Sequence, residues 1–162
     1  MTDENIKDIE NKLILVVDDQ GSIRFVVDSY FKEMGFENIV TAFDGNDALT
    51  FLSQNAVDIV ICDWQMPKIS GLELLKLIRG HENTANLPFI MMTSTSELQN
   101  VKDAASFGVS DYLIKPFQPA QLGYKVIQLL TKSKHQAKRL PLNIEKLQTG
   151  DANPVDLEDH IE

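Results

Sequence analysis

The chain contains five short apolar runs, and four of them are followed directly by a chemically reactive side chain. The runs are Leu13–Val17, Ile39–Phe43, Val57–Cys62, Phe89–Met92 and Tyr112–Ile114. The reactive residues that follow them are Asp18 with Asp19, then Asp63, Thr93 and Lys115. The carboxyl ends of strands in an open parallel sheet face one crevice, where ligands bind. We therefore expect three carboxylates, a hydroxyl and an ammonium to meet there, a set that suits a divalent cation and a phosphoryl group.

Segments with helical spacing of apolar residues separate these runs. They are expected to begin near Ser22, Asp44, Ser70, Ser96 or Glu97, and Pro119. Strands that alternate with helices predict an α/β fold, a doubly wound five-stranded parallel sheet with helices on both faces. The continuous apolar stretch Ile59–Ile61 fits a sheet covered on both sides. The flavodoxin-like order 2-1-3-4-5 would make the first and third strands neighbours.

The length of 162 residues indicates one domain with a proper core. Residues 1–11 are read as a flexible acidic N-terminus, and residues 12–132 as the folded domain. Residues 133–162 form a C-terminal extension that is first basic and then acidic. Because its apolar residues are sparse, we expect residues 141–162 to be dispensable for folding.

Composition excludes several classes of function. The net charge of −9 argues against DNA binding over the whole surface. The single cysteine, Cys62, lies in an apolar run, which fits a reducing compartment. The N-terminus has no apolar core, so it is not expected to be a signal peptide. No apolar stretch reaches the roughly 18 residues that a membrane span needs. A cytoplasmic protein without membrane insertion is therefore expected.

The acidic residues suit Mg²⁺, which prefers octahedral oxygen ligands and keeps several waters. Asp19 and Asp63 are expected to bind the ion directly, Asp18 through water, and a backbone carbonyl just after Asp63 could complete the set. A carboxylate can also act as a nucleophile and form an aspartyl-phosphate. Lys115 would then neutralise the phosphoryl oxygens, and Thr93 could donate a hydrogen bond. Each feature alone has a plainer reading, such as a solvated helix start or a simple turn; their order along the chain supports the joint site.

Several segments together resemble the CheY-like receiver domains of two-component response regulators. The matches are Val16–Asp19, Asp44–Leu49, Ile61–Pro67, Ser70–Leu75, Met91–Ser94 and Asp111–Phe117. The resemblance covers roughly residues 12–132, and the combined motifs are highly specific. Residues 21–36, with Arg24, also resemble the chemotaxis-type branch of the family.

The resemblance implies a role for each matched residue. Asp63 would be the phosphoacceptor, and Lys115 would contact the phosphoryl group. Asp18 and Asp19 would hold Mg²⁺ together with Asp63 and the backbone carbonyl of Gln65. The bond between Lys115 and Pro116 would be cis.

The resemblance also implies how the signal is read and how long it lasts. Thr93 would be the switch hydroxyl, and Tyr112 the aromatic side chain that changes rotamer. Gln65 and Thr95 would flank the phosphoryl group and tune its lifetime. The output partner would then bind the face formed by residues 96–107, the strand 111–115 and the helix that begins at Pro119. Phe117, Lys102 and Asp103 are candidate contacts on that face.

The implied function is that of a single-domain response regulator rather than an enzyme, with at most slow self-dephosphorylation. The phosphodonor would be a phosphohistidine on a sensor histidine kinase or a phosphotransfer protein. A phosphatase with an aspartyl-phosphate intermediate is a competing hypothesis, but it needs an acid two residues after the nucleophile, where this chain has Gln65. A pseudo-receiver that only binds a partner would normally lack one of the five key residues, and none is missing.

Overall fold

The computed structural model describes residues 3–94, 98–133, 139–143 and 145. The elements, in chain order, are α1 (Asp3–Glu10), β1 (Leu13–Val17), α2 (Gly21–Glu33), β2 (Asn38–Ala42), α3 (Gly45–Gln54), β3 (Ile59–Asp63), α4 (Gly71–Arg79), β4 (Phe89–Ser94), α5 (Leu98–Ser106), β5 (Asp111–Lys115) and α6 (Pro119–Lys132). Over these residues, none of the helices has the length and apolar character needed to cross a bilayer.

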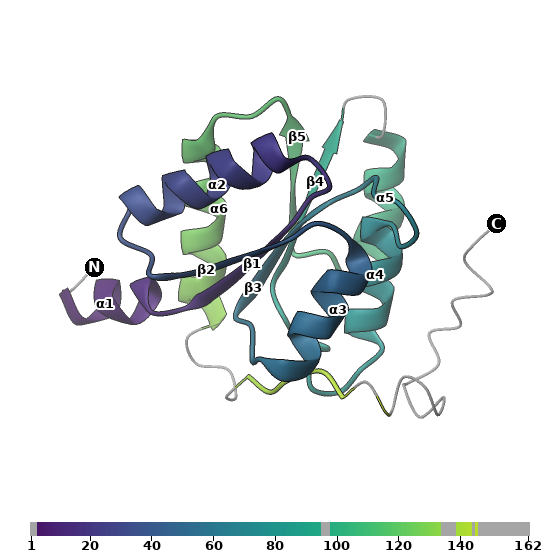
Figure 1. Cartoon of the computed structure of the whole chain (residues 1–162), viewed down its shortest axis with the longest axis horizontal. Helices are drawn as coiled ribbons and strands as arrows, with labels where there is room; N and C mark the ends of the chain where they lie inside the picture. Colours follow the sequence, from purple (N-terminus) through teal and green to yellow (C-terminus); the bar gives the residue numbers. More distant parts are fainter. Residues whose placement is uncertain (1–2, 95–97, 134–138, 144, 146–162) are drawn as a thin grey trace.

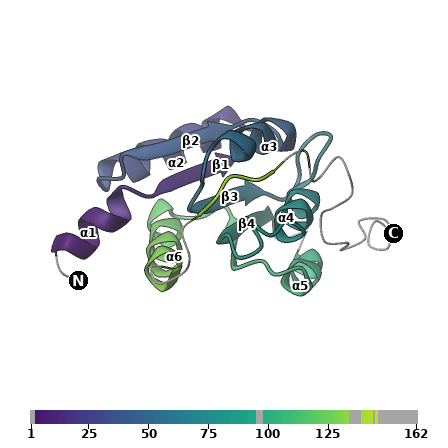
Figure 2. The ribbon, with the colours of Figure 1, turned by 90° about the horizontal axis from the view of Figure 1, so that it is seen from below.

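The strands form one parallel sheet in the order β2-β1-β3-β4-β5, so the predicted fold class and strand order are confirmed. Helices α2 and α6 cover one face, and α3, α4 and α5 cover the other (Figures 1 and 2). Val17 at the end of β1 pairs with Cys62 of β3, and Asp63 pairs with Met92 of β4. This register brings the ends of the central strands to one edge of the sheet.

The core consists of two clusters, one on each face of the sheet. Ile59 and Ile61 of β3 face the cluster beneath α2 and α6, while Val60 and Cys62 face the cluster beneath α3, α4 and α5. All four side chains are fully buried. Alternate residues of a strand point to opposite faces, so the continuous apolar run is the signature of a sheet covered on both sides, as the sequence predicted.

Most of the predicted helix boundaries agree with the structure. The Asp44 side chain accepts a hydrogen bond from the backbone of Asp47, and Ser70 forms a capping box with Glu73. Pro119 is the first residue of α6. The expected cap at Ser22 is wrong, because α2 already begins at Gly21. The expected start of α5 at residue 96 or 97 lies outside the described residues.

The N-terminal segment, which the sequence predicted to be flexible, contains a helix that packs on the domain. Residues 3–10 form α1, and Ile9 is only 8% exposed in the cluster beneath α2 and α6. The backbone N–H of Glu37 also donates to the carbonyl of Glu10 over 3.1 Å. Ile9 and this hydrogen bond connect the acidic segment to the domain, a contact that composition alone does not reveal.

Part of the C-terminal extension packs into the core, which argues against the prediction that residues 141–162 are dispensable for folding. Leu142 is 2% exposed and belongs to the cluster beneath α3, α4 and α5. Its N–H donates to the carbonyl of Leu52 over 2.8 Å, and the Asn83 side chain donates to the carbonyl of Pro141 over 2.9 Å. We call residues 139–143 the strap; it passes below α3 in Figure 1, drawn in yellow-green. Residues 146–162 lie outside the described part of the chain.

Candidate functional site

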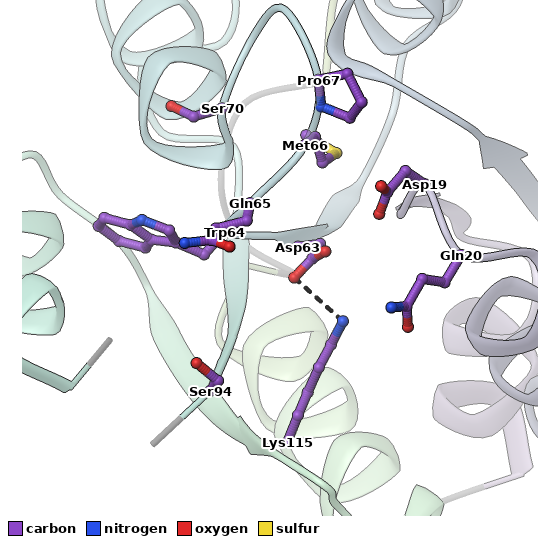
Figure 3. A pocket seen from close by; sticks show the side chains of 10 residues that line it. All are labelled: Asp19, Gln20, Asp63, Trp64, Gln65, Met66, Pro67, Ser70, Ser94 and Lys115. Atoms are coloured by element: carbon purple, nitrogen blue, oxygen red, sulfur yellow. Dashed lines mark ion pairs between the residues drawn. The ribbon is translucent and has the colours of Figure 1, made fainter. Parts of the chain in front are cut away.

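An open cleft lies at the carboxyl edge of the sheet, with a volume of about 670 Å³. Its walls come from the β1–α2 turn, the end of β3 with the loop that follows, and the ends of β4 and β5 (Figure 3). The lining residues are Asp19, Gln20, Asp63, Trp64, Gln65, Met66, Pro67, Ser70, Ser94 and Lys115. The cleft is therefore where the rule for parallel sheets places a ligand.

Three carboxylates meet at this cleft. One ligand atom each from Asp18, Asp19 and Asp63 lie within 4.8 Å of one another. Asp18 is fully buried, Asp63 is 9% exposed, and Asp19 is exposed to solvent. Asp18 and Asp19 follow β1, whereas Asp63 ends the adjacent strand β3. The strand order thus brings together Asp18 and Asp63, which are 45 residues apart in the chain.

Lys115 closes the carboxylate cluster from the other side. Its Nζ lies 2.9 Å from Asp18 Oδ2. The same atom lies 3.1 Å from Asp63 Oδ1 (Figure 3). The Lys115–Pro116 peptide bond is cis, as the family resemblance implied. Burial by itself would lower the pKa of Lys115, but its hydrogen bond and attraction to Asp18, together with Asp63, outweigh burial and raise the pKa. The lysine is therefore held as a cation between two acids.

The surroundings of Asp63 oppose ionisation of its carboxyl group and so raise its pKa. Burial, together with the nearby charge of Asp18, raises its pKa from an ordinary 3.8 to about 6 against the opposing attraction of Lys115. One ammonium does not balance three carboxylates, so additional positive charge at the cleft would favour ionised Asp63. The donor set consists of oxygens only, which is what a hard cation such as Mg²⁺ prefers.

The Asp18 side chain is held by hydrogen bonds on both oxygens. Oδ1 accepts from the backbone N–H of Gln20 over 2.8 Å, and Oδ2 accepts from Lys115. The backbone carbonyl of Asp18 accepts a further bond from Nη1 of Arg24 over 2.6 Å. Asp18 is thus fixed in place, whereas Asp19 faces the open cleft (Figure 3).

The loop after Asp63 closes tightly on β3, and a glycine makes this possible. The N–H of Gly71 donates to the carbonyl of Trp64 over 2.8 Å, and the N–H of Trp64 donates to the carbonyl of Met92 over 2.9 Å. A Cβ atom at position 71 would collide with the carbonyl oxygen of Asp63 and lie 2.9 Å from Met91 Sδ. Only glycine leaves room for this approach.

The other predicted residues divide between the cleft and its surroundings. Gln65 lines the cleft, and Thr93 is fully buried next to it near the end of β4. Tyr112 lies on β5 outside the cleft lining and is 40% exposed. Thr95 lies outside the described residues.

Gln20 and Ser94 are among the lining residues that sequence reasoning did not propose for the site. Each directly follows a residue that the sequence did single out, Asp19 and Thr93 respectively. Their position immediately after a strand-end residue is the signal that could have identified them, because the next residue along also borders the crevice.

The comparisons with known proteins agree with this fold and cleft. The family model described as "Response regulator receiver domain" matches residues 14–127. The chain therefore belongs to the receiver-domain family of response regulators, the CheY-like signalling domains of two-component systems. Members of this family are signalling proteins rather than classical enzymes.

Individual relatives carry chemotaxis names. The chain is 37% identical to the chemotaxis protein CheY-3 of Vibrio cholerae over 123 residues, which is 76% of this chain and 95% of CheY-3. It is 33% identical to the chemotaxis protein CheY of Pseudomonas aeruginosa, over 74% of this chain and 96% of that protein. Among solved structures, the receiver domain of Francisella response regulator 1452 is 32% identical with a TM-score of 0.69, covering 76% of this chain and 99% of that one.

Proposed function

We propose that the protein is a single-domain response regulator that accepts a phosphoryl group on Asp63 and signals by phosphorylation-dependent contact with a protein. The observation that carries the proposal is the position of Asp63. This carboxylate lines the cleft at the end of β3, with Lys115 Nζ 3.1 Å from Oδ1 and two further acids in the same cluster. Membership of the receiver family supports a phosphorylation-dependent role.

The phosphodonor in this proposal is a phosphohistidine on a sensor kinase or a phosphotransfer protein. A carboxylate oxygen of Asp63 attacks phosphorus, and the bond between phosphorus and the imidazole nitrogen breaks. That nitrogen keeps the electron pair and takes a proton from solvent, while Asp63 becomes an acyl phosphate. The cation Lys115 is held where it can move from the carboxylate to the new phosphoryl oxygens, so the charge that develops there meets a preorganised partner.

The residues at the cleft fit Mg²⁺. Asp19 and Asp63, together with the backbone carbonyl of Gln65, would hold the ion directly. Both oxygens of Asp18 already accept hydrogen bonds, which favours an indirect role for Asp18 through water. When bound, the ion supplies positive charge beside the phosphoryl oxygens.

The signal would leave the cleft through Thr93 and Tyr112. Thr93 is buried, and its hydroxyl contacts the Ser94 carbonyl at 3.4 Å, a long and weak hydrogen bond. A phosphoryl group on Asp63 would attract this hydroxyl, and Tyr112 would turn into the space that it leaves. The face formed by α5, β5 and α6, with Phe117, Lys102 and Asp103, would change for a partner protein. A net charge of −9 favours a protein over DNA as this partner.

Gln65 and Thr95 are proposed to tune the lifetime of the phosphoryl group. Gln65 lines the cleft, where its amide would border attacking water. An amide cannot protonate a leaving group, so Gln65 cannot act as the general acid that a phosphatase would have at this position. This supports a phosphoacceptor over the phosphatase hypothesis. The single buried thiol of Cys62 fits a reducing cytoplasm as the place of action.

Labelling with a small phosphodonor tests the central assignment. Asp63→Asn keeps the shape of the side chain and removes the nucleophile, so we expect hydroxylamine-sensitive phosphate to disappear. Asp28→Asn is the matched control, because Asp28 lies on α2 and pairs with Lys32 over 2.9 Å outside the cleft. Labelling of Asp63→Asn at the level of the control would refute the assignment.

A second variant tests the switch separately from phosphorylation. Thr93→Ala is expected to accept phosphate on Asp63 but to respond poorly in partner binding. Equal partner affinity for the phosphorylated wild type and the phosphorylated variant would contradict the switch and leave the phosphoacceptor untouched.

A further inference from the structure

Arg24 does not line the cleft, but its side chain contacts the backbone of the acidic pair. Nη1 of this half-buried arginine donates a 2.6 Å hydrogen bond to the backbone carbonyl of Asp18. Arg24 lies in the first turn of α2, and its own N–H donates to the carbonyl of Gln20 over 3.2 Å. The side chain therefore ties the helix back to the turn that carries the acidic pair.

The carbonyl of Asp18 is part of the peptide group that connects Asp18 with Asp19. Because a peptide group is planar, fixing its oxygen also fixes the direction in which the chain leaves toward Asp19. The second hydrogen bond in this turn, from the Gln20 N–H to Asp18 Oδ1, holds the side chain of the same residue. Arg24 thus restrains the backbone of the turn, and Gln20 and Lys115 restrain the carboxylate.

Arg24 has two possible influences on a cation at the site, and they have opposite signs. Its positive charge repels a cation, so removal of the charge alone would strengthen Mg²⁺ binding. Its hydrogen bond preorganises the acids, so loss of the bond would weaken Mg²⁺ binding. A measurement of the direction of change therefore separates the two.

We propose that Arg24 is a positioning residue that holds the Asp18–Asp19 turn and so raises the affinity of the acidic cluster for Mg²⁺. This proposal rests on the magnesium site of the proposed function. Outer residues that orient metal ligands typically change metal affinity by about 10-fold or more when they are removed, and we expect the same order here.

The experiment titrates Mg²⁺ into the full chain and follows the fluorescence of Trp64, which lines the cleft. Arg24→Met removes the charge and the donors but keeps an unbranched apolar stem, and it should weaken Mg²⁺ binding by about 10-fold. Arg24→Lys keeps the charge and one donor group, and should recover part of the loss. Lys32→Met is the matched control, since Lys32 is a 59% exposed cation on the same helix, and should change the affinity less than about twofold.

Two further measurements separate positioning from loss of the fold or of activity. At saturating Mg²⁺, the labelling rate of Arg24→Met should return close to the wild-type rate, because the chemistry at Asp63 is intact. Without metal, hydrogen exchange of the Gln20 amide should become about fivefold faster as the turn loosens. Arg24→Gln gives a second variant if Arg24→Met does not fold.

Unchanged or tighter Mg²⁺ binding by Arg24→Met would overturn the proposal, as would unchanged exchange of the Gln20 amide. If the wild type itself shows no saturable response to Mg²⁺, the magnesium site of the proposed function is wrong. The exchange experiment, which uses no metal, still decides whether Arg24 holds the turn.

Discussion

Leu142 provides the sharpest test of how far the folded unit extends. Its side chain is 2% exposed and packs in the cluster that contains Leu52, Val57 and Leu87. Replacement of a buried leucine by alanine removes the burial and leaves a cavity, at a typical cost of about 2–5 kcal/mol. The cost depends on how far the site can collapse around the smaller side chain, and we expect Leu142→Ala to cost about 2–3 kcal/mol, in the lower half of that range.

This loss should be visible by thermal and chemical unfolding. For a domain of this size, each kcal/mol lowers Tm by about 2–4 °C, so we expect a decrease of about 4–12 °C. Urea unfolding, followed by circular dichroism, gives the free energy directly. The matched control is Leu140→Ala, because Leu140 lies in the same strap but is 51% exposed. A difference below about 0.5 kcal/mol between the two variants would refute the packing argument, since substitutions at exposed positions fall in that range.

Three further predictions concern the site itself. Gly71→Ala forces a Cβ against the Asp63 carbonyl and should cost about 1–3 kcal/mol. Gly21→Ala should be nearly neutral, because the atom nearest to the added Cβ is 3.4 Å away. Equal urea midpoints for the two variants would contradict this. Lys115→Met leaves buried Asp18 without its cation and should cost about 3–5 kcal/mol. Lys125→Met, whose pair with Asp111 is only partly buried, should cost about 1 kcal/mol or less. In metal-free buffer the folded state holds the proton of Asp63 more tightly than the unfolded state, with a pKa of about 6 against 3.8. The wild type should therefore lose stability relative to Asp63→Asn as the pH rises from about 4 to about 6, by at most about 3 kcal/mol. A stability difference that is constant over this range would show that the pKa of Asp63 is not raised.

The fold and the acid cluster were predictable because both depend on simple periodic information. Apolar runs locate the strands, and the connection rules for parallel sheets leave few orders. Once β1 and β3 are neighbours, Asp18 and Asp63 must lie close together whatever the details of the loops. Lys115 follows for the same reason, because it ends another strand of the same edge.

The remaining features depend on single contacts that no periodic pattern encodes. The hydrogen bond from Arg24 to the Asp18 carbonyl requires a particular rotamer across one turn of helix. The burial of Leu142 requires a docking place made by residues about 55 to 90 positions earlier in the chain, such as Leu52 and Leu87. The sparse apolar residues of segment 141–162 predict a tail outside the core, and tertiary packing overrides this at Leu142.

The two terminal segments extend the domain beyond the stretch that the receiver family model matches, which is residues 14–127. Ile9 of α1 joins the cluster beneath α2 and α6, and Leu142 of the strap joins the cluster on the opposite face. Ile9 and Phe36, which precedes β2, border one small cavity, and the N–H of Leu142 donates to the carbonyl of Leu52 near the end of α3. Both additions therefore lie toward the amino ends of the strands. The cleft that holds the acid cluster lies at the carboxyl ends. The additions can therefore stabilise both faces of the sheet without crowding the acids or Lys115, and the unit that folds should include α1 and the strap.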